Sequence, residues 1–210
     1  MSSAQRASQK ATVEPGNQVS EVHSRSGVLA DRETVEVRFG GSGGQGVVLM
    51  GLILATAANH DRRWVVQTES YGPEARGGYS RSDVIISNDP IDYPKLLQAD
   101  LLVALSQAAA DTYAKALRKD GVLMYDSRQV TDPPVFRGEV IAVPFTEMAV
   151  EETGRVQTAN VLALGAVVKI TGIVSVDSIQ KAVLEAVPAG TEELNGRALS
   201  RGLAVDPGRL

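Results

Sequence analysis

Cysteine is absent from the 210 residues of this sequence, and histidine occurs only at His23 and His60. A chain without cysteine forms no disulfide and no thiolate nucleophile, and it lacks the ordinary ligands of zinc–cysteine sites and iron–sulfur clusters. Two histidines are also a small supply of general bases and metal ligands. We therefore expect no metal site here, and any redox centre should belong to another chain.

An excess of basic residues is also missing, because 21 Lys and Arg stand against 25 Asp and Glu. A net charge of -4 does not indicate the basic surface that binding to a nucleic-acid backbone requires. No apolar run is long enough to span a membrane, and the N-terminus has no signal-peptide core. With 43% hydrophobic residues the chain can bury a core. We expect a cytoplasmic globular protein with no nucleic-acid and no membrane partner.

The N-terminal residues 1–34 are polar, rich in Ser and Gln, and without hydrophobic periodicity. This composition predicts a disordered arm, either a solvated tail or a segment that docks on a partner. Three acidic residues, Glu14, Glu21 and Asp31, argue against a transit peptide. Residues 35–210 show no repeat and no change in composition, which predicts a single domain.

Beyond the arm, the pattern of apolar residues predicts alternating strands and helices. Apolar and charged residues alternate over 34–39, a glycine-rich segment follows, and residues 47–59 carry no charge, as in a largely buried helix. Further strands are expected at 64–68, 82–87, 101–105, 122–125 and 140–143, and further helices at 106–120, 146–154, 158–171, 176–187 and 191–205. The pattern indicates an α/β, Rossmann-like, mostly parallel sheet with helices on both faces and a helical C-terminal part.

The segment FGGSGGQGVVL places G-x-G-x-x-G between the first strand and the first helix. Its residues are Gly41, Ser42, Gly43, Gly44, Gln45 and Gly46. Such a loop presents backbone N–H groups and a helix N-terminus to an anion, with no Cβ in the way. The other interpretation is a tight turn that only lets the helix pack close to the sheet.

A dinucleotide site needs an acid about twenty residues further on, at the end of the second strand, to bind the ribose. Asp61 has the spacing but precedes the strand at 64–68, whereas Glu69 follows that strand and lies late. The NAD hypothesis is therefore weakened and stays open.

Three further positions are candidate cofactor-binding sites. In SYGPEARGGYS, Tyr71 and Arg76 could bind an anionic or planar group, or the segment could be an exposed loop with an ordinary ion pair. Ser106 ends a strand, where α/β sheets gather ligands, and it could equally cap a helix. Asn160 begins an apolar helix, where a polar group needs a partner, and a satisfied amide or a cap is the simpler role.

Five segments, taken in order, resemble the γ subunit of the 2-oxoacid:ferredoxin (acceptor) oxidoreductases, most of all the 2-oxoglutarate type. The segments are GGSGGQGVVLMGLILA, SYGPEARGGYSRSDVIIS, IDYP, ADLLVALSQ and TANVLALGAV. The resemblance covers residues 35–190. It implies a part in the coenzyme A-dependent oxidative decarboxylation of a 2-oxoacid, with pyruvate, branched-chain, indolepyruvate and arylglyoxylate as other substrates. Thiamine diphosphate, Mg²⁺ and the iron–sulfur clusters would then belong to partner subunits, and this chain would hold no catalytic residue.

The resemblance also implies roles for individual residues. The amides of Gly41–Gly46 would face the phosphates of coenzyme A, with Ser42 and Gln45 as side-chain donors, and the Tyr71–Gly78 loop would face the neighbouring subunits. Asn160 matches a family position without an assigned role. The partners would be α and β subunits, a ferredoxin-like δ subunit, and ferredoxin or another acceptor. Two alternatives stay open: a self-contained NAD- or flavin-dependent oxidoreductase, and a non-catalytic assembly scaffold.

Overall fold

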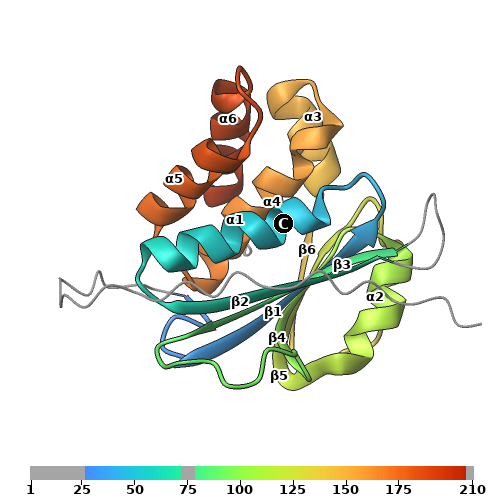
Figure 1. Ribbon diagram of the computed structural model, residues 1–210. Coiled ribbons are helices and arrows are strands. Elements are labelled where there is room, and N and C mark those ends of the chain that lie inside the picture. Colours follow the sequence, from blue (N-terminus) through green and yellow to red (C-terminus); the bar gives the residue numbers. More distant parts are fainter. Residues whose placement is uncertain (1–26, 72–78, 207–210) are drawn as a thin grey trace, which may run out of the picture.

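The computed structural model describes residues 27–71 and 79–206, which form a six-stranded sheet with helices on both faces (Figure 1). The order across the sheet is β2-β3-β1-β4-β5-β6. β1, β4, β5 and β6 pair in parallel, whereas β3 pairs antiparallel with both β1 and β2. The α/β, mostly parallel fold is therefore confirmed. The strands are β1 (Thr34–Ser42), β2 (Trp64–Tyr71), β3 (Tyr79–Ser87), β4 (Ala99–Ala104), β5 (Leu117–Asp126) and β6 (Glu139–Val143).

The helices divide unequally between the two faces of the sheet (Figure 1). One face carries the main core, in which Val35, Val37 and Phe39 of β1 pack with apolar residues of the longer helices. The other face carries a smaller core beneath α2. The helices are α1 (Val47–His60), α2 (Gln107–Tyr113), α3 (Phe145–Thr153), α4 (Ala159–Thr171), α5 (Val176–Ala186) and α6 (Glu192–Leu203), with short 3-10 turns η1 (Ala114–Ala116) and η2 (Val156–Thr158). None of the helices among these residues could span a membrane.

The expected helix over 106–120 is wrong in its second half. α2 ends at Tyr113, and after η1 the chain enters β5 at Leu117. Leu117 pairs with Ala99 of β4 and is buried in the core beneath α2, so tertiary pairing overrides a favourable helix propensity. Gly121 is therefore no helix stop; a Cβ there would lie 2.9 Å from the carbonyl oxygen of Asp100.

Packed structure is already present at Gly27, the first described residue, eight residues before the expected domain start. Val28 and Leu29 donate backbone hydrogen bonds to Ile170 and Thr171 at the end of α4, both at 3.1 Å. Leu29 is buried, and a Cβ on Gly27 would lie 2.3 Å from the carbonyl carbon of Thr171. Residues 27–33 therefore belong to the domain. The remainder of the expected arm, residues 1–26, lies outside the described residues.

Two glycines bring α4 and α6 into close contact. A Cβ on Gly165 would lie 2.4 Å from the carbonyl oxygen of Leu199, and one on Gly202 would lie 2.0 Å from that of Leu162. The two backbones therefore approach closely enough to exclude any side chain at either position.

The order of the strands places a switch point between β1 and β4. From β1 the chain passes through α1 to β2 at one edge, whereas from β4 it passes through α2 to β5 on the other side. Loops that leave adjacent parallel strands in opposite directions open a crevice at the carboxyl ends of the strands, where α/β proteins bind ligands. The glycine loop follows β1 at this point.

Candidate functional site

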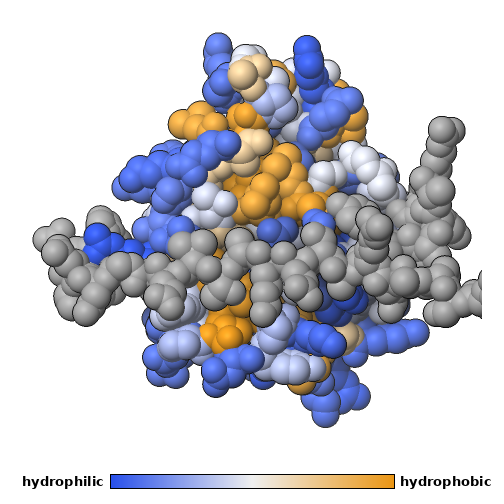
Figure 2. Space-filling view, viewed as in Figure 1, coloured by the Kyte–Doolittle hydropathy of each residue, from blue (hydrophilic) through white to orange (hydrophobic). Residues whose placement is uncertain are grey.

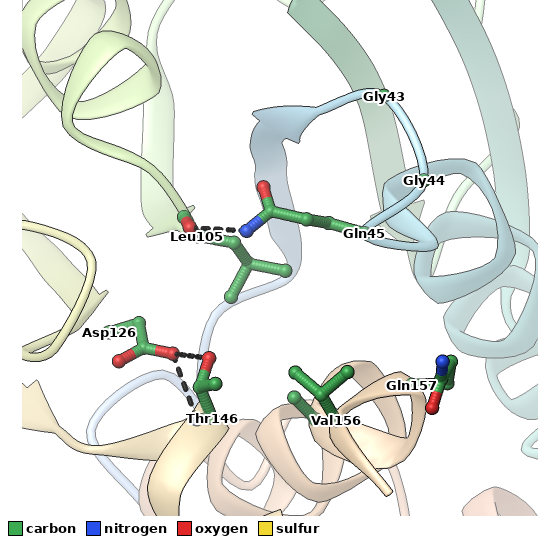
Figure 3. Close-up of a pocket in the computed structure, with 9 residues that line it drawn as sticks. Gly43, Gly44, Gln45, Leu105, Asp126, Thr146, Val156 and Gln157 are labelled. Atoms are coloured by element: carbon green, nitrogen blue, oxygen red, sulfur yellow. Dashed lines mark hydrogen bonds between the residues drawn. The ribbon is translucent and has the colours of Figure 1, made fainter. Parts of the chain in front are cut away.

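A cavity of about 310 Å³ opens at the carboxyl ends of the parallel strands (Figure 3). The glycine loop forms one wall, the ends of β4 and β5 form the floor, and the beginnings of α3 and α4 form the opposite wall. The lining residues are Gly43, Gly44, Gln45, Leu105, Asp126, Thr146, Val156, Gln157 and Ala159.

The glycine loop uses glycine for two different reasons. Gly44 has a φ of 90° with no atom within 4 Å of its missing Cβ, so the backbone conformation alone favours glycine. Gly46 has a φ of 72°, and a Cβ there would also lie 2.1 Å from the amide nitrogen of Asn160. The loop therefore turns sharply into α1 while α4 approaches it closely.

Among the described residues, no side chain compensates the N-terminus of α1. Its N-cap is Gly46, no side chain caps it, and its first turn contains no acidic residue. By contrast, Ser106 caps α2 and Ser175 caps α5. Because the first amides of a helix lack intrahelical acceptors, this end of α1 offers backbone donors and a positive dipole to an anion.

Gln45 braces the loop through its side-chain amide (Figure 3). Its Oε1 accepts from the backbone N–H of Ser42 at 2.6 Å, and its Nε2 donates to the carbonyl oxygen of Leu105 at 2.7 Å. A Cβ on Gly41 would lie 2.7 Å from that Oε1, so Gly41 makes room for the brace. Both polar ends of Gln45 thus hold the loop to the end of β4, a role that the sequence did not suggest.

Asn160 is brought against the glycine loop from the start of α4. Its side chain is buried, its Oδ1 accepts from the N–H of Val161 at 2.8 Å, and its Nδ2 packs on Gly46. Within residues 27–71 and 79–206 that Nδ2 donates no hydrogen bond. Ser106 is different, because its hydroxyl accepts from the N–H of Ala109 at 3.3 Å and caps α2, the other role that the sequence allowed.

The strands that flank the expected Tyr71–Gly78 loop end beside the glycine loop. Tyr71 is the last residue of β2 and pairs with Ser80, while Tyr79 of β3 pairs with Ser42 of β1. Arg76 and the rest of residues 72–78 lie outside the described residues. The strand ends on both sides of residues 72–78 therefore lie at the same edge of the sheet as the glycine loop.

Asp126 and Thr146 are lining residues that sequence reasoning missed (Figure 3). One carboxylate oxygen of Asp126 accepts from the N–H of Thr146 at 2.9 Å and from its hydroxyl at 2.5 Å. The other accepts from the N–H of Arg128 at 2.9 Å. Asp126 is buried and holds the first turn of α3 in place. In the sequence, the only sign of this role was a single acidic residue at the end of a buried strand.

Arg155 lies beside the cavity on a firmly held turn. Its N–H donates to the Thr153 hydroxyl at 3.2 Å, and its carbonyl oxygen accepts from the Thr158 hydroxyl at 2.9 Å. The side chain is exposed, and its guanidinium makes no ion pair with any residue of the described ranges. Arg128, in contrast, hydrogen-bonds Glu147 at 2.6 and 2.7 Å, which lowers the pKa of Glu147.

Neither acid considered for a ribose reaches the glycine loop. Asp61 accepts from the Ser175 N–H and from the hydroxyls of Ser175 and Ser178, all at 2.7 Å, so it is bound to the start of α5. It lies at the far end of the 14-residue α1, about 20 Å from the loop. β3 separates Glu69 on β2 from β1 by two strand spacings, about 10 Å. The NAD hypothesis thus lacks its acid.

Residues 36–205 match the family model described as "Pyruvate ferredoxin/flavodoxin oxidoreductase". The chain belongs to this family. It is 46% identical over 173 residues to the 2-oxoglutarate synthase subunit KorC of Methanocaldococcus jannaschii, a match that covers 81% of this chain and 92% of that relative. As a family member it is a subunit of a 2-oxoacid:ferredoxin oxidoreductase, which confirms the resemblance seen in its motifs.

Two solved structures of oxidoreductases share its fold. The keto/oxoacid ferredoxin oxidoreductase γ subunit of Geobacter sulfurreducens is 45% identical, with a TM-score of 0.74 and coverage of 80% of this chain and 94% of that one. The second is the 2-oxoglutarate:ferredoxin oxidoreductase of Magnetococcus marinus, with 2-oxoglutarate, coenzyme A and succinyl-CoA bound. It is 20% identical, with a TM-score of 0.74 over 83% of this chain and 31% of that chain, and so shows the fold alone.

Proposed function

We propose that this chain is the γ subunit of a 2-oxoglutarate:ferredoxin oxidoreductase and that its glycine loop binds phosphate groups of coenzyme A. The reaction joins CoA to the acyl group that remains when a 2-oxoacid loses CO₂, and two electrons pass to an acceptor. The similarity to KorC supports 2-oxoglutarate as the substrate. The presence of coenzyme A in the Magnetococcus marinus structure supports the ligand.

One observation carries the proposal: an uncapped helix N-terminus opens into a cavity at the switch point of the sheet. Backbone N–H groups at the start of α1 suit phosphate oxygens, because they donate hydrogen bonds along a favourable dipole. Gln45 holds the loop that presents them, and Asn160 adds an amide nitrogen at its side. Arg155 directly precedes the lining residues Val156 and Gln157, and we expect its exposed guanidinium to add positive charge there.

The cavity is sized for part of coenzyme A. At about 310 Å³ it is at the lower end of ligand pockets, which are typically 300–1,000 Å³ for drug-sized molecules. CoA is larger than such molecules, so we expect a neighbouring subunit to bind the remainder. This chain would bind and orient CoA, while the bond-making steps take place in another subunit.

The other cofactors are assigned to partner chains. The described residues contain no group of three or more potential His, Cys, Asp or Glu metal ligands, and the sequence has no cysteine. Thiamine diphosphate with Mg²⁺ and the iron–sulfur clusters would lie in α, β or a ferredoxin-like δ subunit. Ferredoxin as acceptor and a cytoplasmic location stay predictions.

The test is Gly43→Val in the assembled enzyme. Gly44 and Gly46 have left-handed φ angles and Gly43 does not, so valine at 43 avoids that source of backbone strain. A side chain there would keep phosphate from the amides. We expect the KM for CoA to rise about ten- to a hundredfold, as when a hydrogen bond to a charged group is lost, with the KM for the 2-oxoacid unchanged.

The matched control is Gly196→Val on α6, where a new Cβ meets nothing within 4 Å. It should change neither KM. If Gly43→Val assembled normally with an unchanged KM for CoA, the loop would be structural, as in the scaffold alternative. Tight NAD binding by the isolated chain would instead favour the self-contained dehydrogenase.

A further inference from the structure

Helix α1 is unusual among the outer helices because its solvent side carries no charged group before His60, its last residue, which contacts Glu185 of α5 at 3.1 Å. Residues 47–59 include no Asp, Glu, Lys or Arg, yet the helix is not fully enclosed. Its buried residues, among them Met50, Ile53, Leu54 and Ala57, face the sheet and the other helices. A helix that is apolar on all sides is normally buried on all sides.

The outward side of α1 forms a continuous uncharged row, here called the α1 stripe: Val48, Leu52, Ala55 and Asn59. The spacing i, i+4, i+7, i+11 places them on one line along the helix, about 16 Å long. Leu52 is 48% exposed, and the other three are half-buried. Figure 2 shows apolar side chains gathered on this face of the molecule, where α1 crosses it.

The neighbouring helices, unlike α1, carry charged residues on their solvent-exposed sides. α5 exposes Asp177, Lys181 and Glu185, and its exposed Leu184 stands among these charges. On α6, Arg197 is exposed and pairs with Glu152 at 3.1 Å. The α1 stripe has no such group, so its composition is that of an interface core, from which charged residues are depleted.

We propose that the α1 stripe is the surface on which a larger subunit of the same oxidoreductase docks. The matching surface of that subunit would be apolar and without charged residues. This inference rests on the chain being a subunit, not on the assignment of CoA. In the Magnetococcus marinus enzyme the same fold occupies 31% of a longer chain, so there it is joined to a partner more than twice its size. In that enzyme a lasting protein neighbour therefore accompanies the fold.

The position of the stripe indicates which neighbour it meets. Val48 lies two residues after Gly46, so the stripe begins where the glycine loop ends. The cavity of about 310 Å³ opens at that same end, so a subunit that reaches the cavity also approaches the N-terminus of α1. The same approach covers Val48 and Leu52.

The test uses Leu52→Glu in the complete enzyme, produced together with its partner subunits. Because an unpaired carboxylate in an apolar interface is strongly unfavourable, we expect the dissociation constant of this chain from the complex to rise at least about tenfold. Native mass spectrometry and size-exclusion chromatography report the fraction of complexes that retain it. The control is Leu184→Glu, at a leucine that is 54% exposed on the charged side of α5, and it should assemble normally.

Circular dichroism of the free variant checks its fold, and Leu52→Gln, which adds polarity without charge, provides a second measurement with a smaller expected loss. Unchanged retention of both folded variants would overturn the proposal. It would also be overturned if the free chain formed a dimer that Leu52→Glu made monomeric while the complex stayed intact, because the stripe would then bind a second copy. An altered KM for CoA without subunit loss would overturn it as well, because Leu52 would then act on the glycine loop and not on assembly.

Discussion

Gln45→Leu removes both side-chain hydrogen bonds that hold the glycine loop while keeping the volume of the side chain similar. The bonds, at 2.6 and 2.7 Å, link the loop to its own Ser42 and to Leu105 at the end of β4. At about 1 kcal/mol net for each bond, the variant loses about 2 kcal/mol of loop stabilisation. If CoA must restore that loop conformation on binding, its KM rises about thirtyfold.

The assay is steady-state turnover of the assembled enzyme with CoA varied at saturating 2-oxoacid, and then with the two substrates exchanged. We expect the KM for CoA to rise and the KM for the 2-oxoacid to stay constant. Thermal unfolding of the free chain measures the cost to stability independently.

Gln107→Leu is the matched control. Gln107 also ties two segments through its side chain, donating to the carbonyl oxygen of Asp132 at 2.7 Å and accepting from the N–H of Thr131 at 3.0 Å, but it does not line the cavity. It should lower stability by a similar amount and leave the KM for CoA unchanged. Equal effects of both variants on that KM, or no effect of Gln45→Leu, would refute the reasoning.

Three further predictions concern other parts of the chain. Arg155→Ala should raise the KM for CoA several-fold with little change in melting temperature, since its guanidinium has no ion-pair partner among the described residues; an equal rise for the 2-oxoacid would contradict this. Gly165→Ala should destabilise the chain by about 1–3 kcal/mol in chemical denaturation, because its Cβ would overlap the Leu199 carbonyl oxygen. Burial raises the pKa of Glu36, so the native state holds its proton more tightly and stability falls as pH rises through that range. Glu36→Gln should therefore raise the melting temperature at pH 7 and lose this advantage below about pH 4.5.

Local patterns were sufficient to predict the first β-loop-α unit. Alternation over 34–39 predicts a strand, the dense glycines predict a turn, and the uncharged run 47–59 predicts a buried helix. The structure contains all three. The position of β3 between β1 and β2 could not be predicted, because it depends on pairing between distant segments and not on local preference. Leu117 shows the same limit, since only its contact with β4 makes it a strand residue.

The site was predictable at the level of motifs and not at the level of side chains. The glycine loop could be predicted because a dense group of glycines indicates a tight turn or a close backbone approach in any sequence. Its contact with Asn160 joins positions 114 residues apart, and the brace from Gln45 depends on where the end of β4 lies. Asp126 was missed because an acid at the end of a strand indicates a role only when its partners, here in α3, are known.

The nine-residue ladder between β1 and β3, from Thr34 opposite Ser87 to Ser42 opposite Tyr79, extends to the edge of the glycine loop. The strand before the loop is thus bonded on both sides, by β3 and by β4. A ligand that meets a backbone already fixed in place loses less of its binding energy to conformational entropy. The antiparallel strand that interrupts the usual order of this fold therefore preorganises the backbone that we propose binds phosphate, and selectivity among ligands can arise there from the shape of the loop.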